Sequence, residues 1–162
     1  FMVNDLTNRH FGPGAARKVV LVGFAIAVLM SIFLASPRIA IASGTAFLIA
    51  QLLDTQIFHR LRAARWWKGP LASSIAGSIV DTLLFFGIAF AAAFAFLDTG
   101  LGREDSSLAF PVPFLSVFPV EVPLWVSLAA GDFCIKLAMA FVLLVPYKAL
   151  RAIIPDRVLA KA

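Results

Sequence analysis

Four ionisable side chains stand inside long apolar runs of this sequence. Asp81 is the only charge in the run SIVDTLLFF, Asp54 lies in LLDTQIF, and Asp132 and Lys136 share GDFCIK. A charge at the centre of a bilayer costs at least about 2.5–3.5 kcal/mol, so such residues usually face the protein interior and usually have a role. These residues therefore indicate a polar site inside a membrane.

Asp81 is the clearest candidate, because no basic residue within two helical turns can neutralise it. It must be protonated, paired with Lys136 of another helix, or paired with a ligand, and we expect a ligand or proton role. Small residues within 74–78 precede it and would let a second helix approach closely. Asp132 and Lys136 stand four positions apart on one helix face, where they form either a structural ion pair or part of the site.

Gln51 and Asp54 stand three positions apart near the end of a predicted helix. Asp54 is either exposed to solvent, paired with Arg60 or Arg62, or part of the site, and the sequence leaves these alternatives open.

Two further positions have weaker signals. Asn4 and Asp5 either line a cavity or cap a helix at the interface. Phe85 follows Asp81 by one turn and either packs against lipid or forms a stacking wall for a flat ligand.

This set of groups suits a small flat heterocycle. A carboxylate can accept two parallel N–H bonds from an amidine-like edge, as it does from arginine. The N1–H and 2-amino groups of guanine form such an edge, and a lysine or glutamine could donate to the ring carbonyl. Composition alone does not select guanine over other solutes.

Enzyme signatures are missing from the sequence. It has no metal-ligand cluster, no glycine-rich phosphate loop and no Ser-His-Asp set. The stretch Ala129–Asp132 lacks the first glycine of the Gly-x-Gly-Asp motif of intramembrane aspartyl proteases. We therefore predict no catalytic residue, no metal and no cofactor.

Composition indicates an integral membrane protein. The 162 residues are 61% hydrophobic, with a mean hydropathy of +0.94, and only 14% are charged, against about a quarter in soluble domains. The net charge of +5 comes from clusters beside apolar runs, which suits membrane topology and argues against a nucleic-acid partner.

The apolar runs predict an all-α, polytopic membrane protein with a single transmembrane domain over residues 1–162. Runs of about 20 apolar residues form spanning helices, and four are expected here, at residues 19–36, 39–58, 71–97 and 124–147. We also expect that the chain is truncated at its N-terminus and that an outer loop is missing near residues 36–38.

The uneven distribution of basic residues among the loops predicts how the chain is oriented in the membrane. Basic residues gather before the first span, between the second and third, and after the fourth, whereas the loop at 98–105 is net acidic. By the positive-inside rule both ends of this chain should be cytoplasmic. The proline-rich outer stretch 108–123 is predicted to be an interfacial or re-entrant segment, or a loop lying on lipid.

The motifs DLTNRHFGPGAARKVV, RIAIASGTAFLIAQLLDTQIFHRLR, WWKGPLASSIAGSIVDTLLFFGIAF and GDFCIKLAMA together resemble the queuosine precursor transporter family, also grouped as vitamin uptake transporter-like proteins. The resemblance implies a six-helix protein of the inner membrane that imports 7-cyano-7-deazaguanine or 7-aminomethyl-7-deazaguanine. It also implies a fold similar to the substrate-binding components of energy-coupling-factor transporters.

By this resemblance the chain lacks the first helix and most of the second, and the family's polar positions fall on Asp5, Gln51, Asp54, Asp81, Asp132 and Lys136. Arg38 also falls in a family motif. The family is thought to work without an ATPase. Two alternatives stay open, namely a substrate-binding component of an ATPase-driven vitamin or nucleobase importer, and a membrane scaffold. The expected partners are the small-molecule substrate and membrane lipid, and a homodimer is left open.

Overall fold

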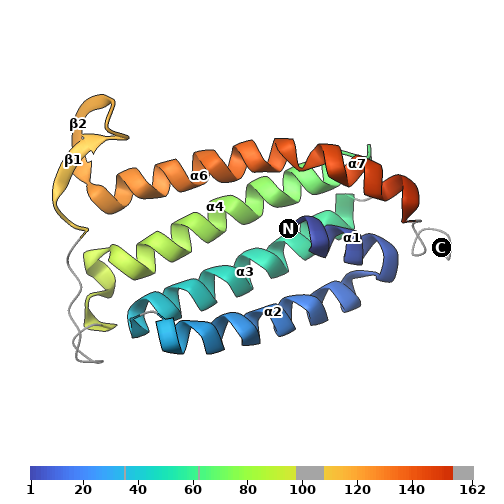
Figure 1. The fold of residues 1–162 in the computed structure, drawn as a ribbon, viewed down its shortest axis with the longest axis horizontal. Helices are drawn as coiled ribbons and strands as arrows, with labels where there is room; N and C mark the ends of the chain where they lie inside the picture. The colour runs from blue at the N-terminus through green and yellow to red at the C-terminus, as the bar shows by residue number, and fades with distance from the viewer. Residues whose placement is uncertain (35, 62, 98–107, 155–162) are drawn as a thin grey trace.

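Four long helices lie side by side in the computed structural model, which describes residues 1–34, 36–61, 63–97 and 108–154 (Figure 1). In spatial order they are α2 (Pro13–Leu34), α3 (Pro37–Leu61), α4 (Lys68–Phe90) and α6 (Leu124–Val142). The described residues contain four stretches long and apolar enough to cross a membrane, and α6 forms one of them together with α7 (Leu144–Ile153). The predicted helical membrane fold with four spans is confirmed.

Two short helices lie at one end of this row, on the right in Figure 1. Helix α1 (Met2–Phe11) packs on α2 and α3 and also contacts α7. Helix α7 follows α6 after a break at Leu143. Pro146 explains the break, because it has no N–H for the carbonyl of Val142 and its ring would clash with that carbonyl.

Small residues allow α3 and α4 to form the most extensive helix contact of the fold. Buried alanines recur at every fourth position of 42–50, and they face buried Ser74, Gly77 and Ser78. A β-carbon at Gly77 would lie 3.5 Å from the carbonyl oxygen of Ala50. The predicted close approach at this small-residue face is confirmed, and it is the expected way for helices to associate in lipid.

Arg38 joins the start of α3 to the end of α4. Its Nε donates to the carbonyl of Ile88 at 2.8 Å and one terminal nitrogen donates to the carbonyl of Ala91 at 2.7 Å. The chain is extended at Ala91 and continues into the short helix η1 (Ala92–Phe94). The predicted span to residue 97 was therefore too long. The Arg38 guanidinium donates the hydrogen bonds that the next helical turn would otherwise give to these two carbonyls.

The sequence left the secondary structure of residues 108–123 open, and the interfacial, re-entrant or lipid-lying position expected for them stays a prediction. Strands β1 (Pro111–Phe114) and β2 (Phe118–Pro123) form an antiparallel hairpin beside the start of α6 (Figure 1). Proline is tolerated there because a two-stranded hairpin leaves one side of each strand without a partner. The turn places Leu115 and Ser116 at φ 53° and 58°, which is unusual for residues with side chains.

Two expectations about loops are not decided here. Helices α2 and α3 are joined through residues 35–36, and the loop predicted to be missing near 36–38 stays a prediction. The acidic loop at 98–105 lies outside the described residues.

Candidate functional site

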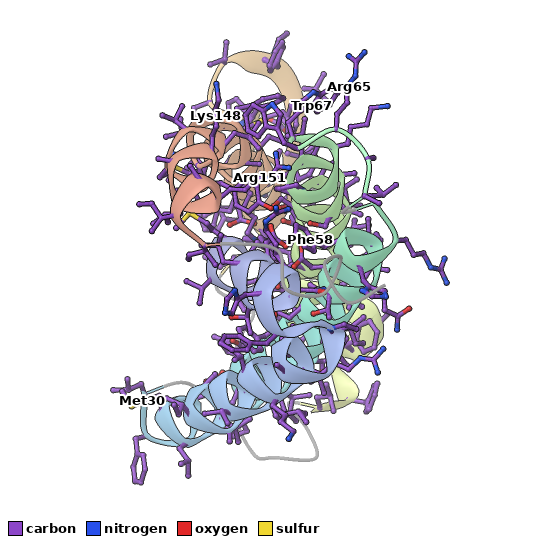
Figure 2. The ribbon with its side chains drawn as sticks, turned by 90° about the vertical axis from the view of Figure 1, so that its right-hand side faces the viewer. Met30, Phe58, Arg65, Trp67, Lys148 and Arg151 are labelled. Carbon is purple, nitrogen blue, oxygen red and sulfur yellow. The ribbon has the colours of Figure 1, made fainter. Side chains whose placement is uncertain are left out.

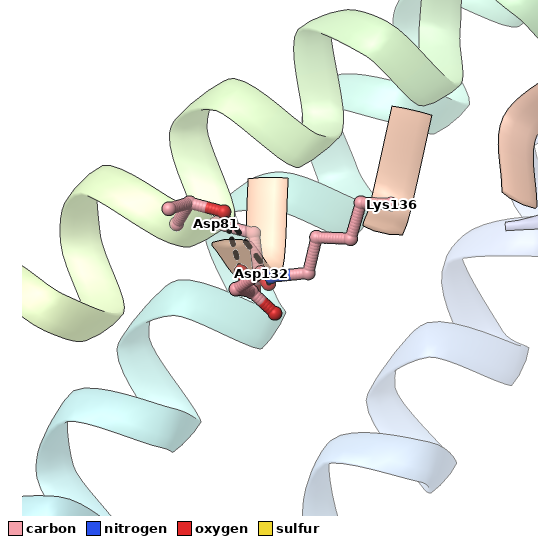
Figure 3. Close-up of polar contacts among 4 residues, drawn as sticks. Asp81, Asp132 and Lys136 are labelled. Carbon is pink, nitrogen blue, oxygen red and sulfur yellow. Dashed lines mark hydrogen bonds and ion pairs between the residues drawn. The ribbon is translucent and has the colours of Figure 1, made fainter. Parts of the chain in front are cut away.

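A cluster of four polar side chains joins α4 to α6. We call Asp81, Thr82, Asp132 and Lys136 the ion-pair cluster (Figure 3). Lys136 Nζ lies 2.6 Å from Asp81 Oδ2 and 2.5 Å from Asp132 Oδ2. The Thr82 hydroxyl donates to Asp132 Oδ2 at 2.7 Å and accepts from Lys136 Nζ at 3.2 Å. Of the three possibilities that the sequence left for Asp81, the structure shows pairing with Lys136.

The ammonium group is saturated in this cluster. It has three N–H donors, and they are matched by Asp81, Asp132 and Thr82. Its side chain keeps 26% of its exposure, and the two carboxylates keep 25% and 32%. The cluster is half-buried, so each charged group has lost much of its contact with water. Its charged and hydroxyl partners replace that lost solvation.

A second polar cluster lies where α1 packs on α3. We call Asn4, Asp5, Asn8, Gln51 and Asp54 the oxygen-rich cluster, in which all but Gln51 are buried. Asn4 Nδ2 donates to Asp54 Oδ2 at 3.1 Å and to the Thr55 hydroxyl at 2.8 Å. Asn8 Nδ2 donates to the backbone carbonyl of Thr55 at 2.8 Å. Asn4 and Asn8 face α3 together because they stand one helical turn apart.

The two carboxyl groups of this cluster are in contact. Asp5 interacts with Asp54 and with the Ser73 hydroxyl of α4. Asp5 and Asp54 are 1% and 0% exposed. Burial, followed by the charge of Asp54, raises the pKa of the Asp5 carboxyl well above its usual range. Of the alternatives that the sequence left open, the structure therefore shows Asp5 lining a cavity and not capping a helix at an interface, and it shows Asp54 buried and not exposed to solvent.

The expected arginine partners of Asp54 are not seen. Arg60 is exposed, and Arg62 lies outside the described residues. The reason is α1, which covers Asp54 and supplies the Asn4 amide in place of a cation.

A cavity of about 120 Å³ lies between the two clusters. Asp5 and Lys136 both line it, and so do Ser74 and Ser78 of α4 and Tyr147 of α7. Most of the remaining lining is apolar, from α6 and the ends of α1 and α7. We call it the central cavity. It combines a carboxyl group, an ammonium group and aromatic edges, which are the groups that the sequence suggested for a flat heterocycle.

The structure brings six of the seven predicted site residues into these clusters. The seventh, Phe85, packs edge-on against Phe86 with ring centroids 5.1 Å apart and against Phe90 at 6.3 Å. It is not among the residues that line the central cavity. A substrate-binding role remains a prediction for all seven.

Several polar residues of the site were not predicted, because little in their sequence positions distinguished them from other polar residues. Asn8, Thr55 and Thr82 are hydrogen-bonded members or neighbours of the clusters. The four-residue spacing of Asn4 and Asn8 could have indicated a polar face on α1. Within the described residues, no three His, Cys, Asp or Glu side chains gather in a way that could hold a metal ion.

Comparison with known proteins gives a consistent family. Residues 27–150 match the family described as "Putative vitamin uptake transporter". The chain is 30% identical to the queuosine precursor transporter of Escherichia coli K12 and 32% identical to the probable queuosine precursor transporter of Haemophilus influenzae. Each alignment covers 90% of this chain, and they cover 65% and 61% of the two relatives.

A probable queuosine precursor transporter of Bacillus subtilis is 23% identical over 96% of this chain and 69% of its own length. No solved structure matches the chain. The chain thus spans somewhat less than two thirds of the length of the first two relatives.

Proposed function

The chain belongs to the vitamin uptake transporter family, and we propose that it carries a 7-deazaguanine precursor of queuosine across the membrane. Three relatives are named queuosine precursor transporters or probable ones. The substrates implied by the resemblance of the motifs are 7-cyano-7-deazaguanine and its aminomethyl relative. Both are flat heterocycles with an amidine-like edge and a ring carbonyl.

The observation that carries this proposal is the central cavity. It lies inside a bundle of membrane helices, and its polar groups come from α1, α4, α6 and α7. An apolar cavity with a few convergent polar groups is the usual form of a small-molecule site. In transporters such sites lie near the midplane, and helices rock around them to expose either side in turn.

The ion-pair cluster supplies contacts that such a motion of the helices would break. Lys136 lines the central cavity and at the same time joins α6 to Asp81 of α4. Separating α4 from α6 would break these bonds, so a ligand that bound better to one arrangement would shift the balance between the two.

We further propose that the protein lies in the inner membrane with the α1–α7 end in the cytoplasm. Figure 2 shows Arg65, Lys148 and Arg151 gathered at this end of the molecule, with Trp67 beside them. Lys148 also lies 5.5 Å from the centre of the Trp66 ring. Basic residues favour the cytoplasmic side and tryptophan favours the interface.

The test is uptake of labelled 7-cyano-7-deazaguanine by the full-length protein in liposomes, with and without a pH gradient. Wild type should show saturable uptake, and Asp81→Asn should lose most of it because the Lys136 ammonium loses one of its two carboxylate charges. Glu121→Gln is the matched control, since Glu121 is an exposed carboxylate of the hairpin. A requirement for the gradient would indicate proton coupling.

Two other results would change the proposal. Absence of uptake, with a ligand that still raises the melting temperature, would indicate a binding component that needs an ATPase partner. Absence of both responses would contradict the proposed substrate.

A further inference from the structure

We propose that the oxygen-rich cluster recognises the N–H edge of the heterocycle, and that the ion-pair cluster holds α4 and α6 together without selecting the ligand. This inference rests on the proposed function and assigns the specificity of its site. The two clusters differ in how many hydrogen bonds their side chains can still form with a ligand.

The ion-pair cluster has no donor to spare for a ligand. All three protons of the Lys136 ammonium have acceptors within 3.2 Å, and the Thr82 hydroxyl uses its proton on Asp132. A ligand carbonyl could engage Lys136 only by displacing one of these partners. Such an exchange replaces one bond by another, so it gives little preference for one heterocycle over another.

The oxygen-rich cluster differs, because it has acceptor oxygens without donors. One side-chain oxygen on each of its five members is buried and has no hydrogen-bond donor among the described residues: Asn4 Oδ1, Asp5 Oδ1, Asn8 Oδ1, Gln51 Oε1 and Asp54 Oδ1. Buried polar atoms are normally paired, and a site with several vacant ones needs an explanation. The vacant atoms of these five residues are all acceptors, so a group with N–H or O–H donors would complete their hydrogen bonding.

Reversing the amides would not supply these donors. The Asn4 amide nitrogen already faces the Asp54 carboxylate and the Thr55 hydroxyl, and that hydroxyl gives its proton to the carbonyl of Gln51. The Asn8 amide nitrogen faces the carbonyl of Thr55. Turning either amide over would place an oxygen against these acceptors. The orientation of both amides is therefore fixed by their neighbours, and their oxygens remain vacant.

Asp5 connects this cluster to the ligand. It is the member that lines the central cavity, and it is hydrogen-bonded to Asp54, which is not among the lining residues. Two carboxyl groups in contact cannot both be ionised at low cost, so one of them holds a proton in the empty site. A heterocycle with two adjacent N–H groups would donate one bond to the vacant Oδ1 of Asp5 and a parallel bond to its other oxygen, and the proton of the pair would then stay on Asp54. The 2-aminopyrimidin-4-one edge of a 7-deazaguanine has this arrangement.

The first test changes the ligand and leaves the protein intact. Competition for uptake is measured with 7-cyano-7-deazaguanine and with its 2-desamino analogue, which lacks one of the two donors. Wild type should prefer the 2-amino compound by about tenfold or more, because hydrogen bonds to charged groups are the strong ones. Equal competition by the two compounds would overturn the inference while leaving transport itself established.

The second test changes the protein and uses the ratio of the two affinities as its readout. Asp5→Asn replaces an acceptor by an amide that can turn a donor toward the ligand, so the ratio should fall to about one. Asp132→Asn, in the ion-pair cluster, should lower the uptake rate and keep the wild-type ratio. Asp54→Asn serves as a second variant if Asp5→Asn does not fold, and it should also lower the ratio.

These results separate the inference from the proposed function. A preserved ratio in Asp5→Asn and Asp54→Asn, or a lost ratio in Asp132→Asn, would overturn the assignment of specificity to the oxygen-rich cluster. Failure of wild type to take up or bind either compound would contradict the proposed function, and with it this inference.

Discussion

Lys136 of α6 and Asp81 of α4 meet with Nζ 2.6 Å from Oδ2, although 55 positions separate them in the chain. The same ammonium also binds Asp132, one helical turn before it. One cation thus neutralises a carboxylate on its own helix and one on the neighbouring helix. The pairing across helices makes the ion-pair cluster part of the α4–α6 contact.

Lys136→Met should destabilise the protein, because it leaves two half-buried carboxylates without their cation. Hydrogen bonds to charged groups contribute about 1.5–3 kcal/mol each, so we expect a loss of at least that size in the free energy of unfolding in detergent. Combining it with Asp81→Asn should cost clearly less than the sum of the two single changes. Lys18→Met, at an exposed position of α2, is the control, and purely additive losses would contradict the pairing.

Asp5 should make the stability of the protein fall as pH rises. Burial raises the pKa of this carboxyl in the folded state above its unfolded value, which is about 3.9. The native state then binds more protons than the unfolded state, so its stability is greatest at low pH and declines until pH passes the folded pKa. Asp5→Asn should remove this decline. Melting temperatures of both proteins between about pH 5 and pH 8 would check it, and parallel profiles would show that Asp5 is not the responsible group.

Arg38→Lys should loosen the end of α4. The guanidinium reaches two carbonyls with two different nitrogens, a geometry that a single ammonium cannot reproduce. We expect a loss of about 1.5–3 kcal/mol in unfolding free energy. Arg17→Lys, at an exposed position of α2, should have almost no effect, and an equal effect of the two substitutions would mean that the contacts to Ile88 and Ala91 contribute little.

Ser127→Ala should release the tip of the hairpin. The backbone N–H of Leu115 donates to the Ser127 hydroxyl at 2.6 Å, and Leu115 also reaches α6 near Gly131. Loss of this bond should speed hydrogen exchange of the Leu115 amide by about tenfold, which corresponds to about 1.4 kcal/mol. Glu121→Gln, on the exposed part of β2, should leave that exchange rate unchanged. An unaltered rate in Ser127→Ala would show that the turn holds its conformation without α6.

Much of the fold could be predicted because membrane helices are specified locally. A run of about 20 apolar residues must form a helix in lipid, whatever its neighbours are. The positions of four spans and the small-residue face before Asp81 follow from such local patterns. Helix ends were harder, because the end of α4 depends on Arg38, which comes from another helix. The hairpin was missed because proline-rich apolar sequence has no helical or alternating pattern.

Composition and the length of the apolar runs are enough to identify a helical membrane protein with acidic side chains inside its spans. The pairing of those side chains became visible only in the three-dimensional packing of the helices. Asp81 meets Lys136, and Asp54 meets Asn4 at a separation of 50 residues. Such pairings depend on the rotation and depth of each helix against its neighbour, which no local pattern records. For the same reason, only the structure shows that one cluster is saturated and the other still lacks donors.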